Sequence, residues 1–467
     1  MVEAKLTELR DASLLILGLG REGQSTWRFL RALFPDKILG AADRLPFEEL
    51  PREAAELLRC DTHARLHLGP DYLASLSQYD VIVKSPGIPV TLPEYARAVA
   101  AGKRITSQTD LFFSNCSGTI IGVTGTKGKS TTASLIHAIL RHAGRKTFLV
   151  GNIGAPALDL LPQAEPDSLF VYELSSHQLE GLRQSPQIAV LLNIVPEHLD
   201  YYENFAQYVA AKENIARYQT ARDWLIYDAD HAIPREIVLR SPGRRLACSL
   251  EQLSVPGCAV VGDGIVWAVA EGRGEKIVDA RDVPLPGRFN LLNVAAAAAA
   301  GRILGIESGV IAEAVRSFRP LEHRLERVGT YGGITYYNDA IATVPEATIA
   351  ALDTLGGDVE TILLGGADRH LDFSRLAERL LQSNVKTVIL FPPTGERIWQ
   401  AVCAQDPAAA GRFAHFLVES MEQAVSLARQ HTAEGKICLH SPASPSFGLF
   451  RDYRDRGEQF KRRVRYE

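Results

Sequence analysis

Short apolar runs alternate with amphipathic stretches along the whole chain. Runs such as "LLIL" from Leu14, "TIIGV" from Thr119 and "LFVY" from Leu169 are mostly apolar on consecutive positions. Between such runs, stretches such as "SLIHAIL" and "RLAERLL" place apolar residues three or four positions apart. Consecutive apolar residues predict buried strands, and the longer period predicts helices packed on one face. This alternation predicts α/β domains built on parallel sheets.

Three blocks of this kind follow one another. With 467 residues, the chain is too long for a single hydrophobic core. We place boundaries near Asn115 and Arg319, which gives domains at 1–115, 116–318 and 319–467. Parallel α/β sheets are expected in all three, and the alanine run at 295–300 is expected to form a tightly packed helix.

Composition narrows the class of protein. The chain is 46% apolar and 23% charged with a net charge of −4, so it lacks the basic field expected for nucleic-acid binding. No apolar run reaches ~18 residues, and the N-terminus lacks the pattern of a signal peptide. The six cysteines form no CxxC pair, which argues against zinc and redox sites. We expect a cytoplasmic protein with neither a membrane span nor a nucleic-acid partner.

The first glycine motif is "GLGREG" at 18–23. It follows an apolar run and precedes a helical stretch, and Asp43 lies 20 residues beyond Gly23. This spacing matches the fingerprint of dinucleotide-binding loops. A helix N-terminus can equally bind the diphosphate of a UDP-sugar, because its free N–H groups do not recognise the nucleoside. A third interpretation is that the glycines only permit close packing, and the residues alone leave all three open.

The second motif, "GVTGTKGKSTT", indicates a phosphate-binding loop. It leads from a strand into a helix and contains the Gly-Lys-Ser sequence typical of nucleoside triphosphate sites. The usual spacing requires a glycine at 123, where the chain has Val123, so the loop is a variant. Backbone N–H groups would hold phosphate, Lys129 would add charge and Ser130 would reach Mg²⁺. The residues expected to bind the nucleotide here are Gly125, Thr126, Lys127, Gly128, Lys129, Ser130 and Thr131.

Two polar residues follow neighbouring apolar runs. Glu173 closes "SLFVYE", and His198 follows "VLLNIVPE". A carboxylate at a strand end beside a phosphate loop suits a Mg²⁺ ligand. His198 is a candidate only by its position, and a structural role remains an equal alternative.

Seven motifs in one order resemble the Mur ligases of peptidoglycan synthesis. They are "GVTGTKGKST", "GNIG", "ELSSHQLE", "LNIVPEHLDYY", "GRFNLLN", "LEHRLE" and "YYNDAIAT". Their spacing matches across nearly the whole chain. "ELSSHQLE" and "SPGIP" are most similar to the branch that adds glutamate to UDP-N-acetylmuramoyl-L-alanine.

The resemblance implies a three-domain α/β architecture and a reaction. A Rossmann-like N-terminal domain would bind the UDP-sugar. The resemblance therefore favours a UDP-sugar over NAD as the ligand of "GLGREG". A central P-loop domain would bind ATP, and a Rossmann-like C-terminal domain would bring the amino acid. The substrate carboxylate would be phosphorylated by ATP, and glutamate would then displace the phosphate to form an amide. A monomer with ATP and two Mg²⁺ ions is implied.

The resemblance also implies roles for single residues. Lys129, His198 and Lys212 would be catalytic, and Lys212 would be carbamylated, which turns a cation into a carboxylate-like metal ligand. The implied metal ligands are Ser130, Glu173, His198 and Lys212. The implied ATP contacts outside the loop are Asn290, Asn293, Arg324 and Asp339. The implied UDP-sugar contacts are Gly18, Gly20, Asp43, Ser85, Gly87, Asn152, Ser175 and Gln178.

The sequence departs from the family pattern around the incoming amino acid. The family's Asn-Asp-Ser-Lys-Ala-Thr-Asn reads "NDAIATVP" here, so Ala340 and Ile341 replace serine and lysine. Arg369 stands where a lysine is usual, and arginine binds a carboxylate with different geometry. The implied glutamate contacts are Thr343, Arg369, Ser446 and Tyr453, with Tyr453 in place of a usual phenylalanine.

These changes leave the glutamate isomer open between D and L. Inverting the α-carbon moves both carboxylates and the amine, and altered basic residues in the acceptor loops favour L-glutamate slightly. Three rival functions are weaker. A folylpolyglutamate-synthase-like ligase would not need "GLGREG", an NAD-dependent oxidoreductase leaves the second motif unexplained, and a non-catalytic regulator would not need Lys129, Glu173, His198 and Lys212 together.

Overall fold

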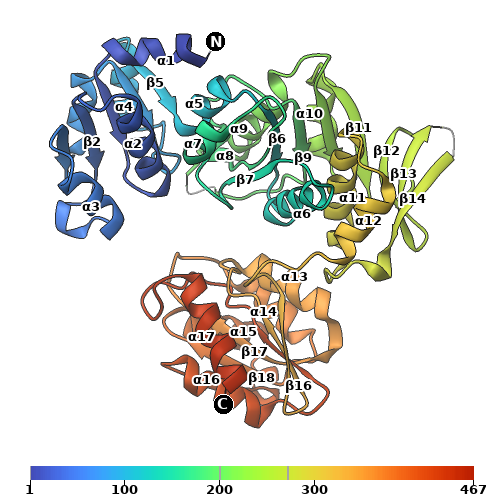
Figure 1. Cartoon of the computed structure of the whole chain (residues 1–467). Helices are drawn as coiled ribbons and strands as arrows, with labels where there is room; N and C mark the ends of the chain where they lie inside the picture. Colours follow the sequence, from blue (N-terminus) through green and yellow to red (C-terminus); the bar gives the residue numbers. More distant parts are fainter. Residues whose placement is uncertain (1, 199–200, 271–272, 467) are drawn as a thin grey trace. The chain divides into compact units, whose positions relative to one another are not determined.

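The computed structural model describes residues 2–198, 201–270 and 273–466, so Leu199 and Asp200 of the "LNIVPEHLDYY" motif lie outside the described residues. The chain forms two compact units (Figure 1). Unit 1 extends to Val283 and includes Phe289–Phe318, and unit 2 comprises Pro284–Arg288 and the chain from Arg319 onward. Unit 1 contains two sheets and unit 2 contains one.

The first sheet of unit 1 is parallel throughout, as the sequence predicts. Its strand order is β3-β2-β1-β4-β5. The order reverses direction at β1, which makes the carboxyl ends of β1 and β4 a topological switch point, the usual place for a ligand in doubly wound sheets. The strands are β1 (Leu14–Leu17), β2 (Leu39–Asp43), β3 (Ala64–Leu68), β4 (Val81–Lys84) and β5 (Arg104–Ser107).

The second sheet of unit 1 has the order β14-β13-β12-β11-β10-β9-β6-β8-β7. The prediction of a parallel sheet is wrong at one edge, where β13 pairs antiparallel with both β12 and β14. Tight turns allow this, since β12 and β13 are separated only by a short connection containing Gly262, whose φ is +60°. The strands are β6 (Thr119–Thr124), β7 (Thr147–Gly151), β8 (Leu169–Glu173), β9 (Ile188–Leu191), β10 (Trp224–Asp228), β11 (Arg244–Ser249), β12 (Gly257–Val261), β13 (Gly264–Ala270) and β14 (Arg273–Asp279).

The sheet of unit 2 has the order β15-β16-β20-β17-β18-β19 and is also mixed. Its β15–β16 pair is an antiparallel hairpin, against the prediction, because Gly332 and Gly333 both adopt positive φ in the turn. The other pairs are parallel. The strands are β15 (Glu326–Tyr331), β16 (Ile334–Asn338), β17 (Val359–Gly365), β18 (Thr387–Phe391), β19 (Ala414–Leu417) and β20 (Ile437–His440).

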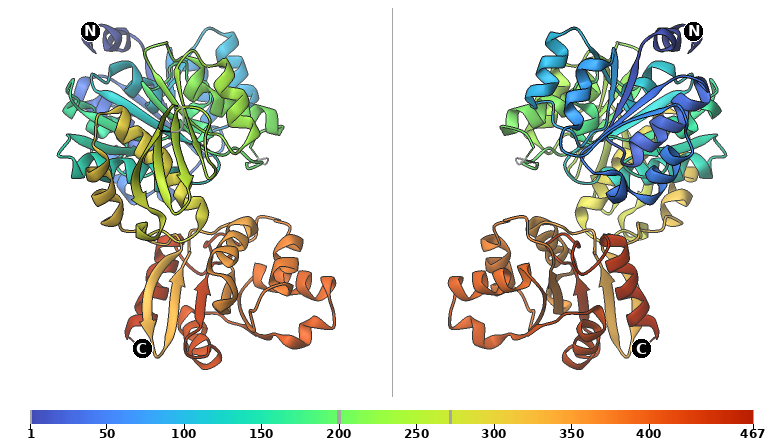
Figure 2. Two further views of the ribbon diagram at one scale, coloured as in Figure 1. Left: turned by 90° about the vertical axis from the view of Figure 1, so that its right-hand side faces the viewer. Right: turned by 90° about the vertical axis from the view of Figure 1, so that its left-hand side faces the viewer.

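Helices cover these sheets. The alanine run at 295–300 lies in a helix and is fully buried, as predicted. Figure 2 shows the C-terminal helix, in red, packed along the β15–β16 hairpin, where Phe460 meets Tyr336 with ring centroids 6.2 Å apart. The α-helices are α1 (Val2–Asp11), α2 (Arg21–Leu33), α3 (Arg52–Arg59), α4 (Pro93–Ala100), α5 (Gln108–Asn115), α6 (Lys129–His142), α7 (Ala157–Leu160), α8 (Ser176–Leu179), α9 (Phe205–Arg217), α10 (Ala232–Arg240), α11 (Arg288–Ile303), α12 (Ser308–Arg316), α13 (Pro345–Leu355), α14 (Ser374–Leu381), α15 (Thr394–Gln405), α16 (Met421–His431) and α17 (Tyr453–Tyr466).

One hydrophobic core runs through both sheets of unit 1. Phe112 of α5 packs against Phe170 and Tyr172 of β8, with ring centroids 5.1 and 5.7 Å apart. The Thr109 and Tyr172 hydroxyls are hydrogen bonded at 3.2 Å. These contacts fix the first sheet against the second, so sites at their edges belong to one body. Within the described part of the chain, no helix is long and apolar enough to cross a membrane.

Candidate active site

The phosphate-loop motif connects β6 to α6 in a conformation that requires glycine at two positions. Gly128 caps α6 with φ +87°, and a Cβ there would lie 2.4 Å from Asn293 Oδ1. Gly125 has φ +155°, and its Cβ would lie 2.6 Å from Leu192 Cβ. The loop therefore turns tightly against β9 and α11, and the N–H groups at the start of α6 point out of the helix end.

Lys129 folds back over this loop. Its Nζ donates to the carbonyl oxygens of Gly125 and Thr126 at 2.9 and 2.8 Å. The Thr126 hydroxyl is within 3.0 Å of the Tyr208 hydroxyl on α9 and accepts from Val195 N. The loop is thus tied to the segment after β9, and its lysine lies along the loop where a phosphate chain would bind.

Lys212 of α9 reaches the same loop from a fully buried position. Its Nζ donates to the Gly125 carbonyl at 2.7 Å and lies 4.8 Å from the ring centre of Tyr208. Burial, and then the charge of Lys129, lower the pKa of Lys212 well below its usual value, although Glu197 and Glu173 oppose the shift. A lysine with this bias toward the neutral amine is a better nucleophile toward carbon dioxide than an exposed one.

The acidic candidate Glu173 lies next to the loop because its strand neighbours β6. Parallel pairing places Glu173 opposite Val123, two residues before Gly125. Its side chain is buried, and its charge acts on Lys212. The carboxyl ends of β6 and β8 therefore place Glu173 beside the phosphate loop, and Lys212 reaches the same loop from α9.

His198 adopts a left-handed backbone conformation, with φ +59°. Its ring centroid lies 5.1 Å from that of His177 and 6.2 Å from that of Tyr208. Few non-glycine residues adopt a positive φ, and those that do are concentrated at functional sites. The backbone thus directs His198 toward α8 and α9, beside the phosphate loop.

The two asparagines of α11 contact the helix of the loop. Asn293 Oδ1 accepts from the Thr132 hydroxyl at 3.2 Å, and Asn293 Nδ2 donates to Asn290 Oδ1 at 2.8 Å. Both side chains are buried, and Asn293 also faces Gly128. The structure therefore brings Asn290 and Asn293 to the phosphate loop.

The first glycine motif lies at the topological switch point of the first sheet, between β1 and α2. Gly18 has φ +91°, and a Cβ there would lie 2.9 Å from Ser85 Cβ, while Ser85 Oγ donates to the Gly18 carbonyl at 3.0 Å. Asp43 accepts from Leu19 N at 2.7 Å, and Gly20 caps α2. The structure brings Gly18, Gly20, Asp43 and Ser85 together at the ends of β1, β2 and β4, with Gly87 in the following turn.

The remaining substrate candidates lie after β7 and β8 and meet the first sheet. Ser175 and Gln178 form a capping box at the start of α8. Gln178 Nε2 also donates to Glu22 Oε1 at 2.5 Å, and the Arg21 guanidinium donates to the carbonyl of Asn152 at 3.5 Å and to that of Gly154. The start of α2 in the first sheet and the segments after β7 and β8 in the second are therefore joined by direct hydrogen bonds.

Unit 2 brings its candidates to the carboxyl ends of its parallel strands. Asp339 follows β16; its carboxylate accepts from Leu325 N at 3.0 Å and from the Ser441 hydroxyl at 2.8 Å. Burial raises the pKa of Asp339 to about 6. The other candidates lie in segments that precede β15 or follow β16, β17 and β20. They are Arg324, Thr343, the exposed Arg369, the buried Ser446 and Tyr453 at the start of α17.

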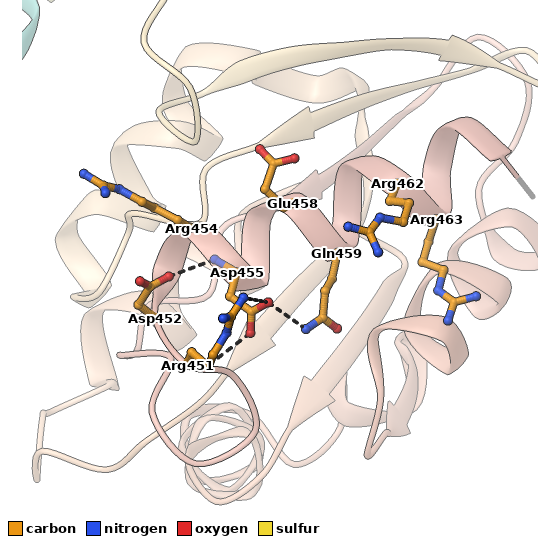
Figure 3. A pocket seen from close by; sticks show the side chains of 8 residues that line it. All are labelled: Arg451, Asp452, Arg454, Asp455, Glu458, Gln459, Arg462 and Arg463. Atoms are coloured by element: carbon orange, nitrogen blue, oxygen red, sulfur yellow. Dashed lines mark hydrogen bonds and ion pairs between the residues drawn. The ribbon is translucent and has the colours of Figure 1, made fainter. Parts of the chain in front are cut away.

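A charged hollow on the outer face of α17 is a different feature (Figure 3). Some of its side chains bond to one another, as Gln459 Nε2 does to Asp455 Oδ1 at 3.2 Å, and others bond outside the hollow, as Glu458 does to Lys461 Nζ at 2.7 Å. None of the predicted acceptor residues lines it. The lining residues are Arg451, Asp452, Arg454, Asp455, Glu458, Gln459, Arg462 and Arg463.

Comparison with known proteins shows the family. The model of the Mur ligase MurD-like N-terminal domain matches residues 12–107, that of the Mur ligase middle domain 123–301, and that of the Mur ligase glutamate ligase domain 323–444. A UDP-N-acetylmuramoylalanine–D-glutamate ligase of Symbiobacterium thermophilum is 37% identical over 96% of each chain. The chain belongs to the Mur ligase family.

Other relatives differ in the isomer that their names give. A UDP-N-acetylmuramoyl-L-alanine–L-glutamate ligase of Xanthomonas axonopodis pv. citri is 35% identical over 98% of this Mur ligase and 96% of the relative. Among solved structures, UDP-N-acetylmuramate-alanine ligase from Thermotoga maritima has a TM-score of 0.60 at 17% identity, covering 97% of this chain and 99% of that one. The MurF ligase from the same organism, in complex with ADP, has a TM-score of 0.56 at 17% identity, covering 98% and 96%. These likenesses show the three-domain fold, and the family makes the chain an ATP-dependent amide-bond-forming ligase.

The structure adds residues of this Mur ligase that the motifs did not single out. Glu197 pairs with Lys127 Nζ at 2.6 Å; burial alone would raise its pKa, but Lys127, Lys129 and His198 hold the pKa below its usual value. Tyr208 contacts both Thr126 and Lys212. Glu197 directly precedes His198 in the sequence, which is the only local signal that could have found it. Tyr208 has none, because its role depends on how α9 packs.

Proposed function

We propose that this Mur ligase joins glutamate to UDP-N-acetylmuramoyl-L-alanine, using ATP and an acyl-phosphate intermediate, in peptidoglycan precursor synthesis. The observation that carries the proposal is the pairing of two phosphate-type sites in unit 1, joined by the Arg21–Asn152 and Glu22–Gln178 hydrogen bonds. One site suits a nucleotide sugar and the other suits ATP. Relatives named as glutamate ligases match nearly the whole chain and support the choice of substrates.

The chemistry explains why this chain needs several cations. A carboxylate is a poor acyl donor until phosphorylation provides a good leaving group. In that step an anionic carboxylate must approach the γ-phosphate of ATP, so positive charge must reduce their repulsion. We assign this positive charge to Lys129, whose ammonium lies along the loop. Lys127 lies in the same loop and is paired with Glu197. The loop N–H groups would hold the phosphates, and Asn290 and Asn293 would hold the adenine side.

We propose Mg²⁺ ligation by Ser130, Glu173, His198 and Lys212. The donor set fits in part: Ser130 offers a hydroxyl at the start of α6 and the buried Glu173 offers a carboxylate beside the loop, as Mg²⁺ prefers oxygen ligands. His198 offers an imidazole, with its ring centroid 6.2 Å from that of Tyr208. Lys212 does not fit as an ammonium, because a cation cannot ligate a metal, but its carbamate would supply two oxygens. When bound, Mg²⁺ would neutralise the phosphates and polarise the transferred group.

The other residues receive roles by position. We propose that Gly18, Gly20, Asp43, Ser85 and Gly87 bind the uridine diphosphate and that Asn152, Ser175 and Gln178 bind the muramoyl-alanine end. The domain at 1–115 would bind the UDP-sugar, the domain at 116–318 would bind ATP, and the domain at 319–467 would bind the amino acid. Arg324 and Asp339 would contact ATP from unit 2. The protein would act as a cytoplasmic monomer, where ATP and nucleotide sugars are available.

For the acceptor we propose L-glutamate, with D-glutamate as the alternative. The loop after β16 has Ile341 where the family has lysine, and Ala340 and Ala342 beside it are buried. A cation near the acceptor carboxylates is therefore absent at that position, while Arg369 offers a guanidinium on an exposed loop. Thr343, Ser446 and Tyr453 would complete the contacts.

Steady-state ADP release tests the acceptor. The purified protein is assayed with ATP, Mg²⁺, UDP-N-acetylmuramoyl-L-alanine and each pure glutamate isomer. We expect ADP release that depends on all substrates, with higher kcat/KM for L-glutamate. Equal or greater kcat/KM with D-glutamate contradicts the choice of isomer, and no release with either isomer contradicts the proposed function.

A further inference from the structure

Three loops meet at one edge of the unit 2 sheet. They comprise residues 339–344, 366–373 and 441–452, and we call them the edge loops. They follow β16, β17 and β20, and these strands are parallel neighbours in the sheet, with β20 in the middle. The carboxyl ends of adjacent parallel strands form the usual place for a ligand in an open α/β sheet.

One guanidinium connects all three. Arg456, from the first turn of α17, is fully buried and donates to the carbonyls of Ala340 and Ser444 at 2.9 and 3.0 Å. It also donates to Pro445 at 3.3 Å and to Gly365, the last residue of β17, at 3.5 Å. Two of the three loops are therefore bonded directly to this side chain, and the third begins at Gly366, next to the bonded Gly365.

The edge loops have little freedom around this guanidinium. A Cβ on Gly366 would lie 2.1 Å from the Pro445 carbonyl oxygen and 3.0 Å from an Arg456 terminal nitrogen. The Ala367 N–H donates to the same Pro445 carbonyl at 2.8 Å, and buried Ala443 has φ +58°. A change in the size or reach of the side chain at 456 must therefore move at least one loop relative to the others.

Charge also makes this arrangement unusual. The guanidinium of Arg456 donates to four neutral backbone carbonyls of the described chain, and the nearby carboxylate of Asp339 acts on it through its charge. Burial lowers the pKa of Arg456 to about 9. Burying a cation without a bonded carboxylate is costly, so a role beyond filling the core is favoured.

We propose that Arg456 is a positioning residue for the acceptor amino acid, fixing the spacing of the edge loops that present Thr343, Arg369 and Ser446. This inference rests on the proposed function, in which Thr343, Arg369 and Ser446 contact the glutamate. The guanidinium suits the task because it donates in several fixed directions from one plane, which lets it reach carbonyls on separate loops. A lysine ammonium at the same place keeps the charge but donates from a single atom.

The test compares Arg456→Lys with a matched control. Arg429 is also in unit 2 and donates to backbone carbonyls, those of Arg463 and Val464 at 2.9 and 3.2 Å, but these lie on α17 away from the edge loops. Wild type, Arg456→Lys and Arg429→Lys are assayed as full chains by ADP release, with glutamate and UDP-N-acetylmuramoyl-L-alanine varied in turn. Thermal unfolding is measured in parallel.

We expect Arg456→Lys to raise the KM for glutamate by about tenfold to a hundredfold, the effect expected of a misplacement of about 1 Å. The KM for the UDP-sugar, whose proposed site lies in unit 1, should stay the same, and Arg429→Lys should change neither constant. A glutamate KM unchanged in folded Arg456→Lys, or a parallel loss for both substrates, overturns the inference. Absence of ligation by wild type would instead refute the proposed function.

If Arg456→Lys does not fold, Arg456→Gln provides the second variant, because its amide retains two donors without the charge. A selective rise in its glutamate KM supports the inference. Failure of both variants to fold, with Arg429→Lys folded, would show that Arg456 has a purely structural role.

Discussion

Lys212 Nζ donates to the carbonyl oxygen of Gly125 at 2.7 Å, so a buried lysine of α9 contacts the first glycine of the phosphate loop directly. The same ammonium lies within the field of Lys129, Glu197 and Glu173. A side chain at this position is therefore coupled to both the nucleotide loop and the acidic residues beside it.

Lys212→Ala is expected to lower kcat by about 100-fold or more, because the variant removes a group proposed to stabilise charge at the phosphates. Small carboxylates such as formate or acetate should restore part of the rate by replacing the carbamate oxygens. Lys461→Ala is the control, since Lys461 is also a buried lysine but pairs with Glu326 and Glu458 in unit 2. If carboxylates raised the kcat of Lys461→Ala, or failed to raise that of Lys212→Ala, carbamylation of Lys212 would be contradicted.

Lys129→Ala is expected to reduce kcat by about 10²–10³-fold, as removal of one preorganised donor to a developing charge does elsewhere. The ADP-release assay measures this, and thermal unfolding should show a folded protein. Lys146→Ala serves as the control, because Lys146 forms an exposed pair with Glu165 in the same unit. Ligation that survives Lys129→Ala at the wild-type rate would refute the assigned role of the loop.

Gly125→Ala should abolish measurable ADP binding in calorimetry and destabilise the protein by about 1–3 kcal/mol, because the new Cβ meets Leu192 and φ is +155°. Gly144→Ala is the matched control. Gly144 also has positive φ, +70°, but has open space around it, so we expect a loss of about 1 kcal/mol and normal ADP binding. Normal binding by Gly125→Ala would show that the loop tolerates the displacement.

Glu22 gives a pH-dependent prediction. Burial raises its pKa from 4.5 to about 7, although Gln178, Arg21 and Lys84 oppose the shift. The native state therefore binds more protons than the unfolded chain between these pH values, so this group makes stability fall as pH rises from 4.5 to 7. Glu22→Gln removes the effect while keeping the shape of the protonated acid.

We expect the Glu22→Gln variant to match wild type at pH 4.5 and to be more stable by about 3 kcal/mol at pH 8. Denaturant unfolding at both pH values measures this. The exposed Glu53, replaced by glutamine, should leave the pH profile of wild type unchanged. A constant difference between Glu22→Gln and wild type at all pH values would contradict the shift.

Local sequence signals predicted the elements that position the nucleotide site. The apolar run before Gly125, the period of α6 and the strand before Glu173 are all local signals, whereas the pairing of β6 with β8 is known only from the structure. Sheet edges were not predicted correctly. The double glycine at 332–333 signals the β15–β16 hairpin, but alternation with helices elsewhere suggested parallel strands throughout.

The contacts that depend on packing between distant segments could not be predicted. Glu22 and Gln178 are far apart in sequence and meet only because the two sheets of unit 1 share a core. The role of Arg456 could not be predicted either, because no pattern in α17 indicates that one guanidinium reaches the ends of three strands. Such residues can be identified only once the fold is known.

The most direct test is the product formed from UDP-N-acetylmuramoyl-L-alanine, ATP, Mg²⁺ and glutamate by the purified protein. Mass spectrometry should show the UDP-sugar increased by one glutamyl residue, with one ADP and one phosphate released for each amide formed. Omission of any one substrate should abolish both signals. ADP released without an amide product, or an amide formed without ATP, would contradict the account.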